Sequence, residues 1–508
     1  MSHKFKMLDI NREGEISITQ QLVSHISSLI DAGELAPGQR LPATRALAAD
    51  AGINHLTAVR VYRRLAELGY VTAAVGRGTF VRRRIPAPPV AAGVPSAAAL
   101  DDDDWQLGML AQRPVSYADE MLRDALHAPL AGDAIPLGSG YPDPELCPSD
   151  DLAALATEIV AENPRVITDY LQVEGLPELR ERLAELGREA GYATSADEIL
   201  VTTGARQAID LIARAVLGPG DVAVVESPTF AGALASLQAT GARVLPLPVD
   251  GDGVDIDALE RILARHEVKL VALQEACQNP TGADLSPARR ARLLELARSR
   301  GFFVLDDGVY ATMRFDGKPL RRMRADAPSH VIYVDSLSKT IGGGLRIGWI
   351  AASGPVFARI VQLKIDSDIH TAALPQYLAA RYLRGDRHEH WLAAALPAYR
   401  KRRDALLAAL ERHLGDDATW TVPDGGNHVW VTLRDPIDER LLYVEAMRCG
   451  TAFLPGGALM AEKSSRTSMR LSFGLVEPEL LEEGVRRLAV ALREVKRRRR
   501  SAATGALS

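Results

Sequence analysis

The stretch Asp335-Ser336-Leu337-Ser338-Lys339-Thr340-Ile341-Gly342-Gly343-Gly344-Leu345-Arg346 brings together an amine, two hydroxyls, a guanidinium and three glycines. The largely apolar run 330–335 predicts a short buried strand immediately before the serines. A lysine amine can form a Schiff base with an aldehyde, and serine and arginine donors can bind a phosphate dianion. The same stretch also fits a surface loop with a solvated lysine. Residues elsewhere in the chain are needed to distinguish a Schiff-base site from such a loop.

Length and composition indicate a globular protein of more than one domain. The chain has 508 residues, of which 47% are hydrophobic and 25% are charged, and a single core rarely grows beyond about 300 residues. Cys147, Cys277 and Cys449 are scattered without metal-ligand spacing, so we expect a reducing compartment and no metal site. Neither a long apolar run nor an apolar leader is present, and we therefore expect a cytoplasmic protein without membrane contact.

Charge is distributed unevenly along the chain. Residues 1–84 hold 12 Lys/Arg against 7 Asp/Glu, whereas the net charge of the whole chain is −5. The basic N-terminal part, called the head below, therefore precedes an acidic remainder. A basic surface attracts the phosphate backbone of nucleic acid, so the head is the part expected to meet DNA.

The head, residues 1–82, predicts three helices and a hairpin. Helical periodicity covers Ile18–Ile30, a second helix starts near Ala43 or Thr44, and Asn54 is a suitable N-cap for a third over Leu56–Leu68. Strand-like segments follow on both sides of Gly76-Arg77-Gly78. This order is a winged helix-turn-helix, in which we expect Val59, Leu65 and Leu68 of the third helix to face the core. A small helical domain with a merely charged face remains the alternative.

The head resembles the DNA-binding domain of the GntR family, and its Val61-Tyr62 ending resembles the MocR-type branch. The matching stretches begin at Gly33, Gly52 and Gly76. By this resemblance, residues of the second helix, the recognition helix and the wing contact double-stranded operator DNA. These residues are Arg45, His55, Thr57, Arg60, Arg77 and Gly78. His55 stands where the family usually carries arginine, which puts the strength of that contact in question.

Two segments outside the domains have biased composition. Residues 83–135 are rich in Pro and Ala at first and predict a tether, with a helical stretch from about Trp105 to His127. At the other end, residues 496–508 begin with the basic run 496–500, which we interpret as a solvated, disordered tail rather than a DNA contact.

The body, residues 136–495, predicts an α/β fold with a mostly parallel sheet. Short apolar strands alternate with helical stretches, which favours a sheet covered on both faces. The expected strands start at Ile199, Val222, Arg243, Leu270, Phe302 and Val331. Ligands bind such sheets at the carboxyl ends of the strands, and polar or glycine-containing turns follow these strands one after another. We expect a smaller C-terminal subdomain over about 355–495.

Each strand-end turn has an ordinary structural explanation, but their order is specific. The series Gly204, Phe230, Asn279, Asp307, Tyr310, Lys339, Arg346 resembles the fold-type I, aspartate-aminotransferase-like enzymes that use pyridoxal phosphate. Matching segments around Gly140, Tyr170 and Arg470 extend this resemblance over nearly the whole body. A winged helix-turn-helix joined to this body is the MocR-type arrangement of GntR-family regulators.

The resemblance implies a role for each residue. Lys339 would form the Schiff base with pyridoxal 5′-phosphate, and Asp307 would pair with the pyridine nitrogen; Asp306 is the open alternative. Tyr170 would come from a partner subunit, which implies a homodimer, and Arg470 with Gly140 would bind the carboxylate of a substrate or effector. Asn279 and Tyr310 would bond the ring hydroxyl, and Phe230 would stack on the ring. The phosphate would be held by Gly204, Ala205, Arg206, Ser336, Ser338, Arg346 and the partner's Tyr170.

Two functions follow from this combination. In the first, the protein is a transcriptional regulator whose body senses an amino compound, or pyridoxal phosphate itself, through Lys339, without physiological turnover. In the second, it is a working aminotransferase that carries a DNA-binding module, since Asp307, Lys339 and Arg470 are all present. The segment Ala231-Gly232-Ala233 lacks the arginine that some relatives use for a second acid group, which speaks against broad activity.

Overall fold

The computed structural model of the chain divides into two compact units, residues 1–111 and 112–508. It describes residues 18–31, 35, 39–67, 70–74, 78–81, 123, 134–193, 195–318, 320–462 and 464–504. Most of the expected linker 83–135, including nearly all of the helix expected from Trp105 to His127, lies outside the described residues; Arg123 alone within that stretch is described, as helical.

The head has the predicted three helices and hairpin. The elements are α2 (Ile18–Asp31), α3 (Thr44–Asp50), α4 (His55–Glu67), β1 (Val71–Ala74) and β2 (Gly78–Val81), and β1 pairs antiparallel with β2. Leu22, Ile26, Leu47, Val61 and Leu65 are fully buried and form the core that joins the helices. The winged helix-turn-helix prediction is therefore confirmed.

The core face of α4 differs from our expectation by one position. Val59 is 39% exposed, whereas Ala58, Val61 and Leu65 are fully buried. Positions spaced by three and four residues share a helix face, so the face defined by 58, 61 and 65 leaves residue 59 to one side. Assigning Val59 to the core was wrong, and Leu68 lies outside the described residues.

The body contains the predicted, mostly parallel sheet. Its strands are β4 (Ile199–Thr202), β5 (Val222–Ser227), β6 (Arg243–Asp250), β7 (Gly253–Val254), β8 (Val268–Leu273), β9 (Phe303–Asp307), β10 (Val331–Ser336) and β11 (Gly348–Ala351). They lie in the order β4-β11-β10-β9-β8-β5-β6-β7. The strands β10, β9, β8, β5 and β6 are mutually parallel, while β11 and β7 run antiparallel to their neighbours. All six expected strands are present.

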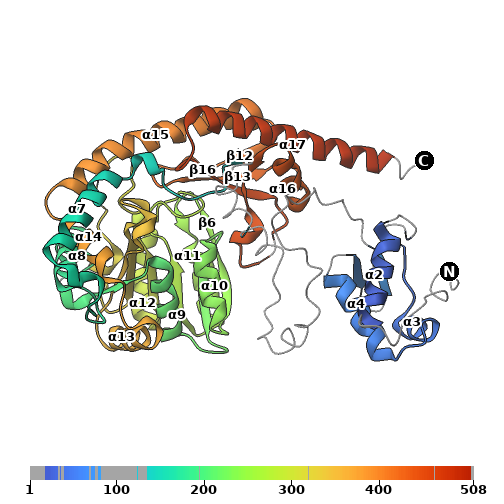
Figure 1. Cartoon of the computed structure of the whole chain (residues 1–508), viewed down its shortest axis with the longest axis horizontal. Helices are drawn as coiled ribbons and strands as arrows, with labels where there is room; N and C mark the ends of the chain where they lie inside the picture. Colours follow the sequence, from blue (N-terminus) through green and yellow to red (C-terminus); the bar gives the residue numbers. More distant parts are fainter. Residues whose placement is uncertain are drawn as a thin grey trace. The chain divides into compact units, whose positions relative to one another are not determined.

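Helices cover both faces of this sheet, as Figure 1 shows. One face packs against α9 (Ala205–Val216), α10 (Ala231–Ala239) and α13 (Pro355–Asp368). The other packs against α8 (Pro177–Ala190) and α14 (Ala373–Tyr382) near β4, and against α11 (Ile256–Leu263) and α12 (Pro287–Arg300) near β8; α7 (Ser149–Glu162) lies beside α14. Because side chains alternate between faces along a strand, Leu305 and Asp307 point to the α9 side, whereas Val304 and Asp306 point to the opposite side.

A smaller sheet follows the large one. Its strands, in the order β12-β13-β16-β15, are β12 (Ala418–Trp420), β13 (His428–Leu433), β16 (Ser468–Ser472) and β15 (Leu454–Pro455), and β3 (Ile135–Pro136) pairs separately with β14 (Thr451–Ala452). It packs with α15 (Arg387–Leu414), α16 (Glu439–Arg448) and α17 (Pro478–Thr504). The expected subdomain start near 355 is too early, because α13 and α14 pack on the large sheet.

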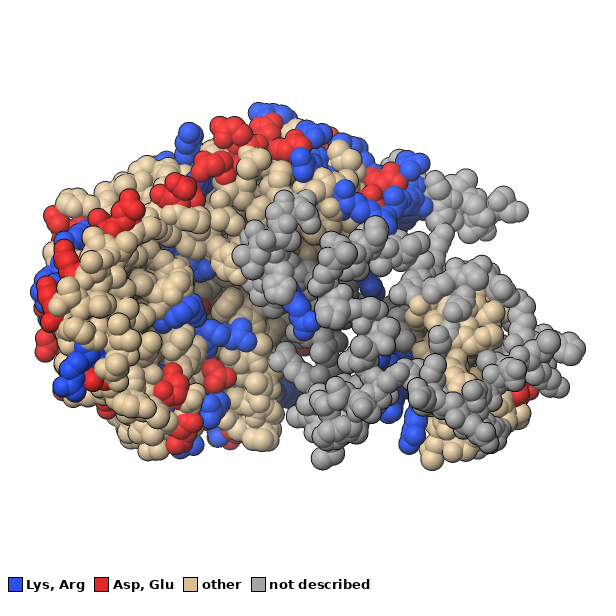
Figure 2. All heavy atoms as spheres, viewed as in Figure 1, with Lys and Arg blue, Asp and Glu red and all other residues tan. Residues whose placement is uncertain are grey.

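The basic run 496–500 is helical rather than a disordered tail. Helix α17 continues to Thr504, and Lys496 Nζ donates to Asp417 (2.6 Å) and Asp435 (3.0 Å). Figure 2 shows acidic and basic side chains interspersed along the rim formed by α15 and α17. These ion pairs neutralise part of the basic run. They explain why residues 496–504 form a helix where we expected a disordered tail. Among the described residues no helix is both long and apolar enough to cross a membrane.

Candidate functional site

Lys339 lies in a short 3-10 turn, Leu337–Lys339, that directly follows β10. Its Nζ donates to the carbonyl oxygen of Gly140 (2.7 Å) and lies 5.9 Å from the centre of the Tyr310 ring. Burial lowers the pKa of the Lys339 amine to about 8, and the charges of Arg470 and Arg346 act in the same direction against the opposing charge of Asp307. The amine is therefore deprotonated, and nucleophilic, at a lower pH than an ordinary lysine.

A group of donors surrounds the N-terminus of α9, close to the lysine turn. Gly204 precedes the helix with φ of +87°, and a Cβ there would lie 2.6 Å from Nη2 of Arg346. Arg346 Nη2 donates to the Thr203 carbonyl (3.1 Å), and the Ser336 hydroxyl donates to that of Ser338 (2.9 Å). The first N–H groups of a helix lack intrahelical acceptors, so this arrangement suits an anion such as a phosphate. The Arg206 side chain is exposed.

Asp307 ends β9 on the α9 side of the sheet. Gln274 Nε2 donates to its Oδ2 (3.0 Å), and the Val309 N–H donates to its Oδ1 (3.4 Å). Burial raises the pKa of the Asp307 carboxyl to about 7, so a nearby cation would favour its ionised form. Asp306 lies on the opposite face, where its Oδ1 accepts from the Glu275 N–H (3.2 Å).

Asn279 and Arg470 meet at the edge of the site formed by the small sheet. Arg470 donates through Nη1 to Asn279 Oδ1 (3.1 Å) and through Nη2 to the Gly138 carbonyl (2.8 Å). Its Nε is buried and has no hydrogen-bond partner in the structure. Burial lowers the pKa of this guanidinium to about 10, which leaves it charged near neutral pH. A buried cation with an unused donor is suited to an incoming carboxylate.

Phe230 and Tyr170 are placed differently from the groups around Lys339. Phe230 is the residue before α10, is half-buried, and packs over Gly232, where a Cβ would lie 2.3 Å from the phenyl ring. Tyr170 is 79% exposed, and its ring meets that of His370 edge-on at 5.4 Å. Tyr170 is therefore accessible to another molecule.

Three residues of the site were not found from the sequence. Gln274 follows β8 directly and also accepts from the Asn279 N–H (2.6 Å), so the strand-end rule applied to β8 could have found it. His428 forms hydrogen bonds through Nε2 with Tyr310 Oη (2.9 Å) and through Nδ1 with Ser472 Oγ (2.9 Å). His428 and Ser472 come from β13 and β16, and no local pattern places those strands beside Lys339.

Three of the DNA-binding candidates, His55, Thr57 and Arg60, lie on α4, and Arg45 lies on α3. Asn54 caps α4 as predicted, accepting from the Thr57 N–H (2.7 Å). His55 Nε2 is 3.1 Å from the Thr44 hydroxyl, which joins the starts of α3 and α4. His55 and Arg60 are exposed, and so is Leu56. Gly78 begins β2, while Arg77 and the side chain of Arg45 lie outside the described residues.

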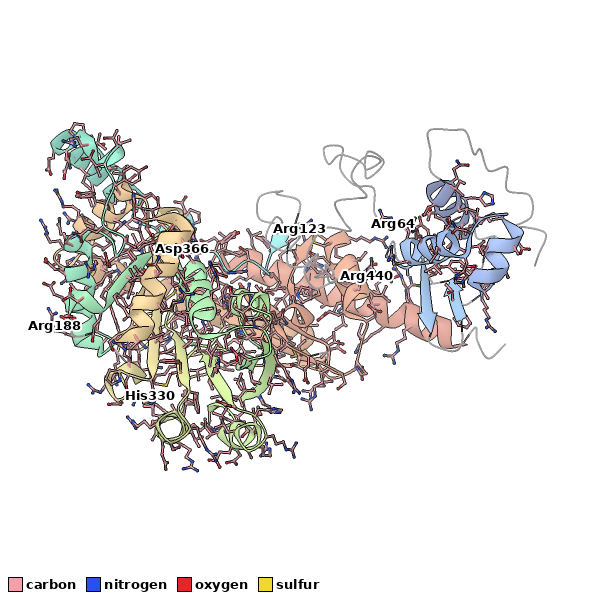
Figure 3. All side chains as sticks on the ribbon, turned by 90° about the horizontal axis from the view of Figure 1, so that it is seen from below. Arg64, Arg123, Arg188, His330, Asp366 and Arg440 are labelled. Carbon is pink, nitrogen blue, oxygen red and sulfur yellow. The ribbon has the colours of Figure 1, made fainter. Side chains whose placement is uncertain are left out.

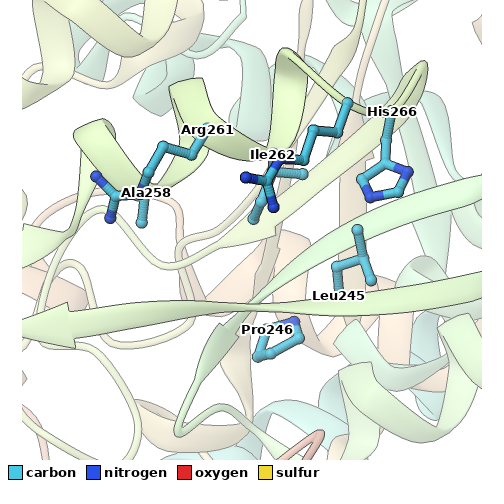
Figure 4. Close-up of a pocket in the computed structure, with 7 residues that line it drawn as sticks. Leu245, Pro246, Ala258, Arg261, Ile262 and His266 are labelled. Atoms are coloured by element: carbon cyan, nitrogen blue, oxygen red, sulfur yellow. The ribbon is translucent and has the colours of Figure 1, made fainter.

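A surface hollow lies apart from this site, between β6 and α11 (Figure 4). It is lined by Leu245, Pro246, Ala258, Arg261, Ile262, Arg265 and His266. None of these residues belongs to the group around Lys339, and we assign the hollow no role.

Comparisons with known proteins match both units. Residues 133–488 match the model of aminotransferase class I and II, and residues 18–81 match that of bacterial regulatory proteins of the gntR family. Aromatic-amino-acid aminotransferase 1 of Thermococcus litoralis is 35% identical over 73% of this chain and 91% of its own length. The probable rhizopine catabolism regulatory protein MocR of Rhizobium meliloti is 26% identical over 96% of each chain. The crystal structure of a multiple substrate aminotransferase from Thermococcus profundus has a TM-score of 0.71 and 31% identity, covering 77% of this chain and 99% of that one.

Proposed function

The chain belongs to the class I and II aminotransferase family and carries a GntR-family DNA-binding domain, and we propose that its body senses an amino compound and thereby adjusts DNA binding by its head. It is a GntR-type regulator fused to an aminotransferase-like domain of the kind that uses pyridoxal 5′-phosphate. One observation supports the proposal most strongly: the chain contains the Lys339 site, and its head and body together match the regulatory protein MocR. We propose residues 1–82 as the DNA-binding domain and 136–495 as the sensing domain.

The residues around Lys339 fit pyridoxal phosphate. When bound, the cofactor supplies an aldehyde that links reversibly to an amine and a ring that withdraws electrons. Lys339 provides the amine, and Ser336, Ser338, Arg346 and the N-terminus of α9 provide phosphate donors. The close approach of Arg346 to Gly204, which has no Cβ to block it, supports this assignment.

We assign the ring nitrogen to Asp307 rather than to Asp306. Strand alternation places Asp307 on the same face as α9, whereas Asp306 points to the face that carries Arg322. A protonated ring nitrogen beside Asp307 would add to the charge of Lys339 in favouring the ionised form of this buried carboxyl. Asn279 and Tyr310 remain our candidates for the ring hydroxyl, and Phe230 for stacking on the ring.

The effector we propose is an amino compound with a carboxylate. Arg470 offers the unused Nε donor near Lys339, and Gly140 lies directly beside its guanidinium, since a Cβ there would lie 3.4 Å from Arg470 Nη2. The amine would take the place of Lys339 while the carboxylate meets Arg470. Such a ligand changes DNA binding only if it favours one arrangement of the protein over another.

A homodimer would explain the exposed apolar surface near Tyr170. Tyr170 is 79% exposed, Ile167 66% and Ile369 51%, and the Tyr170–His370 ring contact joins the two segments. Ile365 adds a further exposed side chain on α13, next to Asp366, which is also exposed and is labelled in Figure 3. Patches of this kind usually mark interfaces, and a second copy would bring its Tyr170 to the phosphate site.

A working aminotransferase is the second candidate, because Lys339, Asp307 and Arg470 are all in place and an aminotransferase is among the relatives. The deciding experiment measures DNA binding and steady-state transamination on one preparation loaded with pyridoxal phosphate, using a DNA fragment from beside its own gene. We expect specific DNA binding with little or no turnover of common amino acids. Fast turnover without specific DNA binding would overturn the proposal in favour of the enzyme.

A further inference from the structure

A buried hydrogen-bond chain crosses the site from the small sheet to the large one. His428 begins β13 and is paired in register with Ser472 on β16. Its Nδ1 lies 2.9 Å from Ser472 Oγ and its Nε2 lies 2.9 Å from Tyr310 Oη, on the loop that follows β9. His428, Ser472 and Tyr310 are each no more than 3% exposed, so their hydrogen bonds are not shared with bulk water.

The chain ends beside the lysine. Gly140, whose carbonyl oxygen accepts from Lys339 Nζ, lies so close to the imidazole that a Cβ would be 3.0 Å from His428 Cε1. Burial, together with the positive charges of Arg470 and Lys339, holds the pKa of the His428 imidazole well below its usual range. A neutral imidazole carries one N–H, so one of its ring nitrogens donates and the other accepts.

The two tautomers differ in what they leave for a ligand. If Nδ1 carried the hydrogen, Nε2 would accept the Tyr310 hydroxyl hydrogen, and the buried Ser472 hydroxyl would keep a hydrogen without an acceptor among the described residues. If Nε2 carries the hydrogen, Ser472 donates to Nδ1 and His428 donates to Tyr310. Each arrangement leaves one hydroxyl hydrogen without an acceptor, and the second leaves that of Tyr310. The Tyr310 ring centre lies 5.9 Å from Lys339 Nζ, so this hydrogen is available to a ligand bound at the lysine.

We propose that His428 is a positioning residue: held as the Nε2–H tautomer by Ser472, it makes Tyr310 a hydrogen-bond donor to the ring oxygen of the bound cofactor. This inference rests on the proposed function, because it requires the cofactor to lie between Lys339 and Tyr310. The phenolic oxygen of pyridoxal phosphate carries negative charge when ionised, and a donor stabilises that form. His428 itself need not touch the cofactor.

The test follows the absorbance of the bound cofactor as a function of pH in the full-length protein. Tyr310→Phe removes the donor, and His428→Phe removes the group that directs it. Because loss of a hydrogen bond to an ionised oxygen disfavours ionisation, both variants should raise the apparent pKa of the spectral transition by about one pH unit. The double variant should match Tyr310→Phe alone, since the two residues act through one bond.

Further variants separate positioning from packing. His428→Gln keeps a side-chain N–H and should restore part of the wild-type value, whereas Ser472→Ala, the mildest change, should give a smaller shift in the same direction. His388→Phe replaces a histidine outside the site, stacked on Trp391, and should leave the transition unchanged. A wild-type transition in both His428→Phe and Ser472→Ala would overturn the inference.

The same spectra distinguish failure of the inference from failure of the proposed function. If the wild-type protein takes up pyridoxal phosphate with a band that Lys339→Ala removes, the cofactor site stands, and the His428 variants then decide the inference alone. If Lys339→Ala leaves the band unchanged, the proposed function fails first and the inference fails with it.

Discussion

Helix α4 of the head and the Lys339 site of the body use charge in opposite ways. On α4, His55 and Arg60 are exposed around a small apolar core that holds the helix. In the body, Asp307, His428 and Arg470 are buried, and burial shifts the pKa of each. The head is thus built to meet a partner that arrives with its own charge. The body is built to tune groups that react with, or bind, a small molecule.

The largest effect that this comparison predicts is for Lys339→Ala. Removing the amine should abolish covalent attachment of pyridoxal phosphate and its absorbance band completely, while direct DNA binding by the head should persist. Absorbance spectra after gel filtration measure the first outcome and fluorescence anisotropy of labelled DNA the second. Lys318→Ala, an exposed lysine, is the matched control. Retention of the attached cofactor by Lys339→Ala would contradict the assignment of the site.

Arg470→Leu should affect the effector rather than the cofactor link. It removes the buried guanidinium and leaves Asn279 Oδ1 and the Gly138 carbonyl without their donor. Loss of a charge-assisted hydrogen bond costs about 1.5–3 kcal/mol, so affinity for a carboxylate-containing amino compound should fall about tenfold to a hundredfold. Titrating the protein with the amino compound while following the cofactor spectrum measures this affinity. Arg466→Leu, at an exposed position, is the control. Unchanged affinity would exclude Arg470 as the carboxylate site.

The rate of cofactor loading should report the burial of Lys339. With the pKa of the amine lowered to about 8, the deprotonated fraction, and hence the rate, should rise about tenfold from pH 7 to 9 and then level off. The reaction of pyridoxal phosphate with an acetylated lysine amide should instead keep rising beyond pH 10. If the pH dependence of the loading rate of the protein followed that of the free amine, burial would not lower the pKa of Lys339.

Substitution on the head should produce a salt-dependent effect. Arg60→Ala removes an exposed charge on α4. Loss of one phosphate contact should weaken DNA binding several-fold. It should also reduce, by about one, the slope of the logarithm of the binding constant against the logarithm of the salt concentration. Anisotropy titrations at several salt concentrations measure both quantities, with Arg165→Ala, an exposed arginine of the body, as control. Equal behaviour of the two variants would remove Arg60 from the DNA surface.

The smallest effect concerns the α4 face that we assigned wrongly from the sequence. Val59→Ala, at a 39% exposed position, should change the free energy of unfolding of the head by less than about 0.5 kcal/mol. Leu65→Ala, at a fully buried position of the same helix, should cost about 2–5 kcal/mol. Urea unfolding compares them, and similar costs for both would place Val59 in the core after all.

Local pattern and chemistry were enough to predict the large sheet and several of its strand-end residues, although Gln274 at the end of β8 was missed. Strands such as β9 and β10 are short, apolar and bounded by turn residues, and parallel strands bring Asp307 and Lys339 to one edge. His428 could not be predicted in this way, because its place depends on the pairing of β13 with β16 and on the docking of both near Tyr310. The basic run 496–500 was misjudged because Lys496 pairs with Asp417 and Asp435, which lie far away in the sequence. Arg497 and Arg498 pair with Glu494 on the same helix.

The proposed function requires that the Lys339 site and the head are coupled, and a DNA-binding titration can detect this coupling. Binding of full-length protein to its DNA is titrated with and without an amino compound at a concentration that saturates the change in the cofactor spectrum. We expect the DNA dissociation constant to change about fivefold or more, and we expect Lys339→Ala to abolish this change. If the spectral change were saturated and the DNA dissociation constant stayed the same, the site and the head would not be coupled.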